Sequence, residues 1–410
     1  MTTRVFIILL LQIFLAVAAF AGQAPDLMQQ IHAFNADVAS SVPQLYQNKL
    51  EAMAEDLFSF LRGTAHIMNN DLQTNPELAL IKTSPVGMIA GDLHMHNFSV
   101  LNANGKKPDY VIDDLDEAFD GAPLAFDIFR LGVSVLTGYS DKLTPAEQQT
   151  VLQKLFAGYL ARAANNRATD WPATPFPEFM QDFIDDSIDV KYKKFIGKRS
   201  TKSSPNLLNF DRFDPVEDAE AASASLSLSS YLGSLSGVQK EAAAILDIAQ
   251  RYDKGLASIG LKRYYALLQG PTADWQDDIL LEFKVMRTSS VAPADIVTQR
   301  QTTIAAMKRA HHITDPFLGT MEHAGKAFLV KQVFAWDETL ENSQALSPAQ
   351  IGDLAEVLGY ITADFHAASG KGGEMKAWLE KSADSLVPLI VGYHAKLQKD
   401  YQIFIAGVKK

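Results

Sequence analysis

Two polar segments decide the fold of this chain: Gly91-Asp92-Leu93-His94-Met95-His96-Asn97 and the acidic run Asp113-Asp114-Leu115-Asp116-Glu117. Short apolar stretches at residues 85–90, 98–101 and 110–112 flank them, and such stretches are typical of strands. We therefore expect both segments to be loops beside strands, where a rigid frame presents their side chains.

The side chains of these segments match the needs of phosphoryl transfer. Asp92 can accept a hydroxyl proton, and Asn97 can bind a metal through a neutral carbonyl oxygen. Asp114 and Asp116 can add anionic ligands, and hard oxygen donors suit a Mg²⁺ ion that bridges phosphate oxygens. Asp92 or Asn97 alone would more often cap a turn. The acids are interspersed with apolar residues, however, and a buried carboxylate is costly unless it is paired or metal-bound.

His94 and His96 allow a different interpretation. A His-x-His pair after an apolar strand is how some zinc hydrolases hold their metal, with further ligands from later strands. The sequence contains no HExxH pattern, and it has too few predicted strands for a barrel hydrolase. Metal-dependent hydrolysis through His94 and His96 stays as an alternative.

Composition limits the partners. The chain has 410 residues, of which 47% are hydrophobic, so it is long enough for two or three packed units. Its net charge of −11 argues against non-specific binding of nucleic acid, although a local site can still bind small phosphorylated ligands. The absence of cysteine excludes disulfides and thiolate nucleophiles.

Residues 1–21 have the features of a signal peptide. Arg4 precedes an apolar run over residues 5–20, and Ala19-Phe20-Ala21 is a small-x-small cleavage pattern. The alternative, an uncleaved anchor, is less favoured because the run is short for a membrane span of about 20 residues. We expect an exported protein, periplasmic or secreted, with no stable transmembrane segment after cleavage.

The remaining pattern predicts an α+β fold in which helices dominate. Helices are expected at residues 26–61, 126–136, 144–160, 176–195, 239–252, 292–312, 347–366 and 375–398, the last with a break at Pro388. Strands are expected in the three stretches above, at residues 327–334, and in a hairpin formed by residues 255–269 and 279–285. Residues 198–236, rich in Ser and Asp, are expected to form a long loop or linker.

The first polar segment resembles the catalytic loop of aminoglycoside and choline phosphotransferases, His-Gly-Asp-x-His-x-x-Asn, with Ala90 in place of the leading histidine. This resemblance implies that Asp92 is the general base and Asn97 a magnesium ligand. It also implies a metal-binding aspartate at the end of a strand, Asp114 or its neighbour Asp113. Asp127, before a predicted buried helix, matches a structural aspartate of that family.

A closer resemblance covers most of the mature chain. Phe60-Leu-Arg-Gly63, Asp114-Leu-Asp-Glu117 and Phe126-Asp-Ile-Phe-Arg-Leu131 are similar to motifs of the bacterial domain-of-unknown-function family DUF2252, which is grouped with protein-kinase-like folds. Gly255-Leu-Ala-Ser-Ile-Gly260 resembles its glycine loop and Leu281-Glu-Phe-Lys284 its strand lysine. The resemblance implies cofactors Mg²⁺ and ATP. It further implies a set of site residues: Asp92, His94 and Arg62 for catalysis, Gly255, Ser258, Gly260 and Lys284 for the cofactor, and Asn97, Asp114 and Asp116 for the metal.

In ordinary kinases the glycine loop and lysine precede the catalytic loop, whereas here they follow it. The resemblance therefore implies a circularly permuted, two-lobed fold. Its parts would be residues 22–200 with the catalytic loop, a linker at 201–236, residues 237–340 with the glycine loop and lysine, and C-terminal helices at 341–410.

Three departures from the pattern leave the activity open. Ala257 replaces the middle glycine of the loop, and Val285 stands where the family has Glu after the lysine. Between Val285 and Met321 there is no Glu to pair with Lys284, and Asp295 is a possible substitute. The chain is thus expected to be a phosphotransferase acting on a small molecule or, alternatively, a non-catalytic ligand-binding protein of pseudokinase type. Export counts against ATP, which is scarce outside the cytoplasm.

Overall fold

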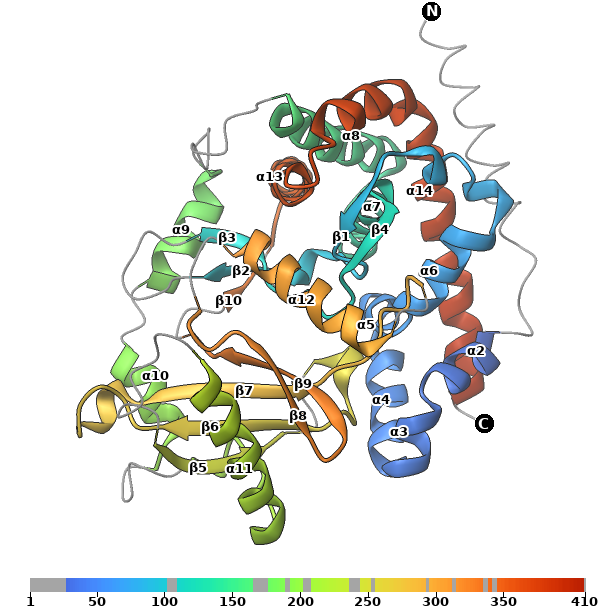
Figure 1. Cartoon of the computed structure of the whole chain (residues 1–410). Helices are drawn as coiled ribbons and strands as arrows, with labels where there is room; N and C mark the ends of the chain where they lie inside the picture. The colour runs from blue at the N-terminus through green and yellow to red at the C-terminus, as the bar shows by residue number, and fades with distance from the viewer. Residues whose placement is uncertain are drawn as a thin grey trace, which may run out of the picture.

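The computed structural model describes residues 27–101, 109–164, 176–188, 192–201, 208–235, 244–251, 255–292, 295–311, 315–334, 338–340 and 345–408. The predicted signal peptide lies outside these residues. Within them, helices dominate and the strands form three small sheets, so the α+β expectation is confirmed (Figure 1). In the described part of the chain, no helix has the length and apolar character that a membrane span requires.

Most helices gather on one side of the molecule around one apolar core (Figure 1). They are α2 (Leu27–Phe34), α3 (Ala36–Ser41), α4 (Pro43–Glu55), α5 (Leu57–Gly63), α6 (Ala65–Thr74), α7 (Ala125–Gly138), α8 (Pro145–Ala163), α13 (Pro348–Ala367) and α14 (Gly372–Val408). The predicted N-terminal helical region is confirmed, but it is divided at Asn35, Val42 and Asp56. Asp56 ends α4 in an extended conformation, and its side chain then accepts from Ser59 N to cap α5.

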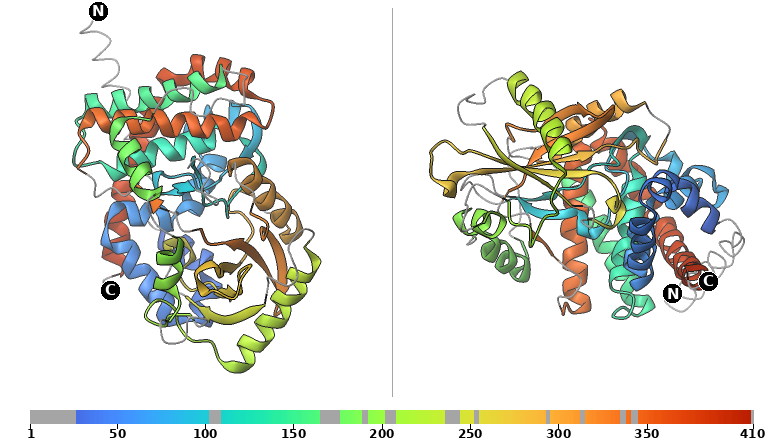
Figure 2. Two further views of the ribbon diagram at one scale, coloured as in Figure 1. Left: turned by 90° about the vertical axis from the view of Figure 1, so that its left-hand side faces the viewer. Right: turned by 90° about the horizontal axis from the view of Figure 1, so that it is seen from below.

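Helices α8 and α13 pack side by side at very close range (Figure 2). Both start with a capping box, Thr144 with Glu147 and Ser347 with Gln350, so their starting points are set by local sequence. A Cβ atom at Gly158 of α8 would lie 1.8 Å from the carbonyl oxygen of Glu356 in α13. The two backbones can approach this closely only because a glycine stands at the contact.

Two short sheets frame the polar segments. Strand β1 (Val86–Ile89) pairs with β4 (Phe119–Pro123), and β2 (Phe98–Leu101) lies between β3 (Asp109–Ile112) and β10 (Glu338–Thr339). The three strands predicted here are confirmed. The 91–97 loop therefore connects β1 with β2, and the acidic run connects β3 with β4.

The third sheet has five antiparallel strands in the order β5-β6-β7-β9-β8. They are β5 (Ile245–Gln250), β6 (Arg263–Leu268), β7 (Ile279–Val285), β8 (Gly319–His323) and β9 (Lys326–Gln332), and the predicted β6–β7 hairpin is confirmed. Because Arg263 is paired with Lys284 and Glu282 with Lys331, these four charged side chains lie on one face of the sheet. The opposite face is apolar and packs against α11 (Asp218–Ser234).

Three expectations are wrong. The loop expected at residues 198–236 contains helix α11, whose Ala- and Ser-rich sequence buries only Ala224, Leu228, Tyr231 and Leu232 and so lacks a clear apolar stripe. The helix expected at 239–252 is strand β5 over its described part, because pairing with β6 outweighs the helix propensity of its alanines. The break expected at Pro388 is absent, and α14 continues through this buried proline.

The other helices are α9 (Glu178–Ile188), α10 (Tyr192–Arg199) and α12 (Ile296–Ala310). Helix α9 lies within the region predicted as helical at residues 176–195, and α10 begins in that region but continues past it to Arg199. Helix α12 follows β7 and lies between the five-stranded sheet and the helical side (Figure 1). Gln299 of α12 donates to the carbonyl oxygens of Asp116 and Ala118, both at 3.1 Å. The helix thereby connects the sheet region to the acidic run.

The close contact of α8 with α13 gives a stability prediction. Gly158→Ala is expected to lower the free energy of unfolding by about 1–3 kcal/mol, because the added methyl group meets backbone that cannot rotate away. Gly373→Ala is the control, since a Cβ there has nothing within 4 Å. The midpoint of urea denaturation measures both, and equal midpoints for the two variants would contradict the packing described.

Candidate functional site

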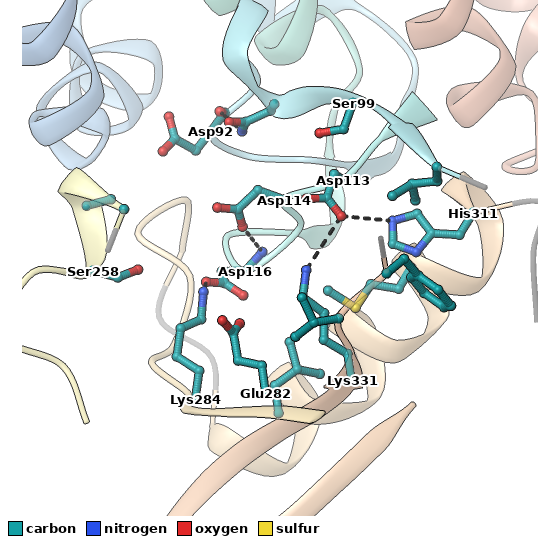
Figure 3. A pocket seen from close by; sticks show the side chains of 18 of the residues that line it. Asp92, Ser99, Asp113, Asp114, Asp116, Ser258, Glu282, Lys284, His311 and Lys331 are labelled. Atoms are coloured by element: carbon teal, nitrogen blue, oxygen red, sulfur yellow. Dashed lines mark hydrogen bonds and ion pairs between the residues drawn. The ribbon is translucent and has the colours of Figure 1, made fainter. Parts of the chain in front are cut away.

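A cavity of about 340 Å³ lies between the charged face of the five-stranded sheet and the two polar segments. Figure 3 shows Asp114 and Asp116 in its middle, with Lys284 and Glu282 reaching toward them from the sheet. Nine predicted site residues line it: Arg62, Asp92, His94, Asn97, Asp114, Asp116, Gly255, Ser258 and Lys284.

Asp92 is held by a buried arginine. Arg130 of α7 donates through Nε to Asp92 Oδ1 at 2.7 Å, and its Nη2 donates to the same oxygen. Asp92 Oδ2 has no hydrogen bond with the described residues, so it is available to a ligand. Burial raises the pKa of Asp92 to about 7, assisted by the nearby Glu117 and Asp114, although Arg130 opposes this shift. A carboxylate with this pKa can exchange a proton near neutral pH.

A buried network around Asp127 supports the start of the 91–97 loop. The Asp127 carboxylate accepts from Ala90 N at 2.7 Å, from Gly91 N at 3.0 Å and from the His366 ring at 3.1 Å. His366, in α13, contacts the Tyr159 hydroxyl of α8 through its other nitrogen at 2.9 Å. Gly91 has a φ of +79°, which favours glycine. Asp127 therefore connects the loop to two helices of the core.

The loop's other functional residue is Asn97. Its side-chain nitrogen donates to the backbone oxygen of Asp92 at 2.8 Å, which closes the loop on itself. Its side-chain carbonyl oxygen has no hydrogen bond with the described residues, although the residue is only 5% exposed. The amide oxygen is thus free to bind a cation or a donor group in the cavity.

Lys284 pairs with Asp116 across the cavity (Figure 3). The two residues come from β7 and the acidic run and are 168 positions apart. Asp114 Oδ1 accepts from Asp116 N at 3.3 Å, so the two carboxylates lie close together. Burial raises the pKa of Asp116, and the neighbouring Asp114 adds to this, whereas Lys284 and Lys331 hold the pKa of Asp114 below its usual value.

The right-hand side of the cavity in Figure 3 is also ion-paired. Lys331 of β9 lies 3.5 Å from Asp113 Oδ1, and the ring of His311 lies 3.9 Å from the same oxygen. On the sheet, Arg263 contacts Glu282 at 3.0 Å. Lys284 and Lys331 of the sheet therefore meet carboxylates of the loops across the cavity, while Glu282 of the sheet is paired with Arg263.

The glycine segment, residues 255–260, lies between β5 and β6 and borders the cavity on another side. Gly255 has a φ of +74° and Gly260 of +85°, so both positions favour glycine. Gly260 does not line the cavity: a Cβ there would lie 2.3 Å from Val38 of α3, so this glycine is explained by packing. Lys49 of α4 donates to the carbonyl oxygen of Ala257 at 2.9 Å and holds the segment in place.

A second, smaller cavity of about 70 Å³ lies beside the first and shares Arg62, Asp92 and Ser258 with it. Lys49 and His66 line only this second cavity. Burial lowers the pKa of Lys49 to about 7 and that of His66 to about 3, so His66 is neutral at neutral pH.

The structure bears on two further expectations, Asp295 as the partner of Lys284 and His94 with His96 as zinc ligands. Asp295 does not replace the missing helix acid, because its exposed side chain caps α12 by accepting from Val297 N and Thr298 N at 2.9 Å. His94 and His96 both pack against Phe58, with ring centroids 5.9 Å and 4.6 Å from it. Among the described residues, no three His, Asp or Glu side chains are arranged to hold a metal ion, so the zinc alternative gains no support.

Sequence reasoning missed several residues of the site, notably Arg130, Lys331, Glu282 and Lys49. Arg130 could have been identified from the sequence, because it is a lone cation three positions after Asp127 in an otherwise apolar helix. A charge buried in such a helix needs a partner. The other three lie in ordinary strand or helix patterns. Their role follows from strand register and helix packing, which one sequence does not reveal.

The support of the 91–97 loop can be tested at Asp127. Asp127→Asn replaces an acceptor oxygen by a donor opposite two backbone N–H groups, so the free energy of unfolding is expected to fall by roughly 1–3 kcal/mol. Thermal and urea denaturation measure the loss. Asp120→Asn, at an exposed position of β4, is the control and is expected to be neutral. A neutral Asp127 variant would show that the network does not support the loop.

The comparisons with known proteins agree with the sequence motifs. No curated protein and no solved structure matches the chain. One family model, described as "Uncharacterized protein conserved in bacteria", matches residues 41–407. This match includes every residue of the site described above except those of α2 and α3 before residue 41. The chain therefore belongs to the DUF2252 family.

Proposed function

We propose that this protein is a Mg²⁺-dependent phosphotransferase that transfers the terminal phosphoryl group of ATP to a hydroxyl group of a small molecule. The observation that carries this proposal is the pairing of Lys284 with Asp116 in a cavity that also contains Asp92 and Asn97. Phosphoryl transfer requires a base, ligands for a cation and positive charge near the phosphates, and these four residues supply that set.

The order of the structural elements supports a kinase-like fold with permuted parts. Protein kinases carry their phosphate-binding lysine on the third strand of a sheet, cover the phosphates with a glycine-rich loop, and follow the lysine strand with a helix. Here Lys284 is on β7, third in the sheet order, the glycine segment joins β5 to β6, and α12 follows β7. The 91–97 loop precedes all of these in the sequence, which is the permutation proposed.

The residues present fit a magnesium ion. Mg²⁺ keeps several waters and binds through one or two carboxylates together with substrate phosphates, so it needs no dense cluster of acids. Asp114, Asp116 and the free amide oxygen of Asn97 all line the cavity. A magnesium ion bound there would neutralise phosphate charge. Without it, the ammonium group of Lys284 neutralises Asp116.

Asp92 has the position and charge state of the base. Asp92 lines the cavity, and Arg130 orients its carboxylate through Oδ1, while Oδ2 has no hydrogen bond with the described residues. In the proposed reaction the acceptor oxygen forms a bond to the terminal phosphorus, the bond from that phosphorus to the bridging oxygen breaks, and ADP leaves. The hydroxyl proton passes to Asp92 Oδ2.

A second function, ligand binding without turnover, is favoured by one specific observation. In kinases an acid on the helix after the lysine strand pairs with the lysine. Among the described residues, Lys284 pairs with Asp116, and Asp295 of the corresponding helix is used as its cap. A protein of this type would bind the nucleotide, and Asp92→Ala would leave the affinity intact.

Nucleotide binding is the first test. The wild-type protein is expected to bind ATP with Mg²⁺ or Mn²⁺ in isothermal titration calorimetry, and not without metal. Lys284→Ala and Asp116→Asn are expected to weaken binding by roughly 10–100-fold, because each removes a charged contact worth about 1.5–3 kcal/mol. Lys326→Ala, at an exposed position of β9, is the control. No binding by the wild type with either metal would refute the proposal.

Turnover and its pH dependence separate the two functions. Because burial raises the pKa of Asp92 to about 7, its basic form increases as the pH rises through this value. For a phosphotransferase, kcat/KM is expected to rise with slope one below about pH 7 and to level off above it. Asp92→Asn is expected to lower kcat by roughly 10²–10⁴-fold and to remove this dependence. An unchanged rate in the Asp92 variant would exclude Asp92 as the base.

A further inference from the structure

The second cavity opens beside Asp92, on the side of the site away from Lys331. Asp92 and Ser258 line both cavities, and Figure 3 shows them on the opposite side of Asp114 and Asp116 from Lys331. A volume of about 70 Å³ exceeds the roughly 10–15 Å³ that one water needs, so a group of several atoms fits. A ligand there would lie next to Asp92 while a nucleotide occupies the first cavity.

Arg62 stands where the two cavities meet. It lines both cavities, and no hydrogen bond or ion pair joins its guanidinium group to the described residues. Its Nε atom is buried without an acceptor. A buried charged donor left unsatisfied costs on the order of 1–3 kcal/mol or more, so an arginine in this state indicates that an acceptor comes from outside the chain.

Lys49 adds an amine to the same cavity, and because burial lowers its pKa to about 7, an anion bound beside it would favour its charged form. It is only 1% exposed, and its ammonium group donates to Asn35 Oδ1 at 2.8 Å and to the Ala257 oxygen at 2.9 Å. Both acceptors are neutral, and within the described ranges no carboxylate lies within ion-pair distance of Lys49. An ammonium group has three donors, so one remains for a ligand.

The acids that line the second cavity are already engaged. Asp92 pairs with Arg130, Asp116 pairs with Lys284, and Asp114 accepts from Asp116 N. Glu117 accepts from the backbone and the hydroxyl of Ser290, at 2.6 and 2.8 Å. In this cavity, Arg62 and Lys49 therefore still have hydrogen-bond donors available to a ligand. One further wall is flat and apolar, formed by Phe34 stacked on neutral His66 at 4.0 Å.

From these contacts we infer that the second cavity holds the acceptor substrate, and that this substrate is a small anionic alcohol. Its carboxylate or phosphoryl oxygens would contact Arg62 and Lys49, and its hydroxyl group would face Asp92. This inference rests on the proposed phosphotransferase function for the acceptor role, whereas the anion site itself does not depend on it. A cationic acceptor would place a further positive charge beside Arg62 and Lys49.

The test uses four small probes in calorimetric titrations of the mature protein. Glycerate carries a carboxylate, glycerol 3-phosphate a phosphoryl group, glycerol no charge and ethanolamine a positive charge. At least one anionic probe is expected to bind at least tenfold more tightly than glycerol and ethanolamine. Whichever of glycerate and glycerol 3-phosphate binds more tightly shows whether the site prefers a carboxylate or a phosphoryl group. Tighter binding of ethanolamine, or no anion binding, would overturn the inference.

Variants locate the binding site. Arg62→Gln is expected to lower the affinity for the anionic probe at least tenfold. Ala65→Leu, which fills the second cavity without removing a charge, is expected to do the same. Lys49→Met should also weaken binding, but it loosens the glycine segment as well, so the other two variants decide. Arg300→Gln, which removes an exposed pair with Glu322 outside both cavities, is the control and is expected to have no effect.

Lys284→Ala separates this inference from the proposed function, because Lys284 lines the first cavity and not the second. It is expected to weaken Mg²⁺-dependent ATP binding by roughly 10–100-fold and to change anion affinity less than threefold. Loss of anion binding in Lys284→Ala, with Arg62→Gln unaffected, would place the anion in the first cavity and overturn the inference. Anion binding that Arg62→Gln weakens, in a protein that binds no nucleotide, would confirm the anion site and refute the phosphotransferase role.

Discussion

The buried carboxylate of Asp127 is the contact on which the site depends most. It accepts from the backbone of Ala90 and Gly91 and from the ring of His366, so it joins β1, α7 and α13 at one point. A carboxylate removed from water is stable only when donors surround it. Here the donors belong to the segment that presents Asp92. The same helix also supplies Arg130, so α7 both positions the loop and orients its acid.

Electrostatic balance across the cavity explains how the two sides of the molecule stay together. Lys284 and Lys331, on the sheet, meet Asp116 and Asp113, on the loops. Such pairs gain little net energy in water, but partly buried pairs are screened less and are costly to separate. A ligand that brings its own charges would exchange partners with these groups. The cavity is therefore stable when empty and still able to bind.

Much of the architecture could be predicted from the sequence, because the strands around the polar segments are short, apolar and bounded by turns. Helix α11 and strand β5 could not, since one buries few side chains and the other follows the alanine run at residues 242–244, and tertiary packing decides both. Nine of the site residues assigned from motifs line the cavity, whereas Gly260 does not. Arg130 and Glu282 were not assigned, although they lie within quoted motifs. Lys49 escaped because its role follows from contact with a segment 208 positions away.

Helix α14 gives the chain a particular order of assembly. It begins after α13, packs against α7 and α8, and reaches α2, α4 and α5 at the opposite end of the sequence (Figure 1). The N-terminal helices therefore take part of their apolar cover from a helix more than 300 residues later in the chain. Contacts of such long range form slowly and late. Packing of the N-terminal helices is therefore completed only after residues 372–408 have been synthesised.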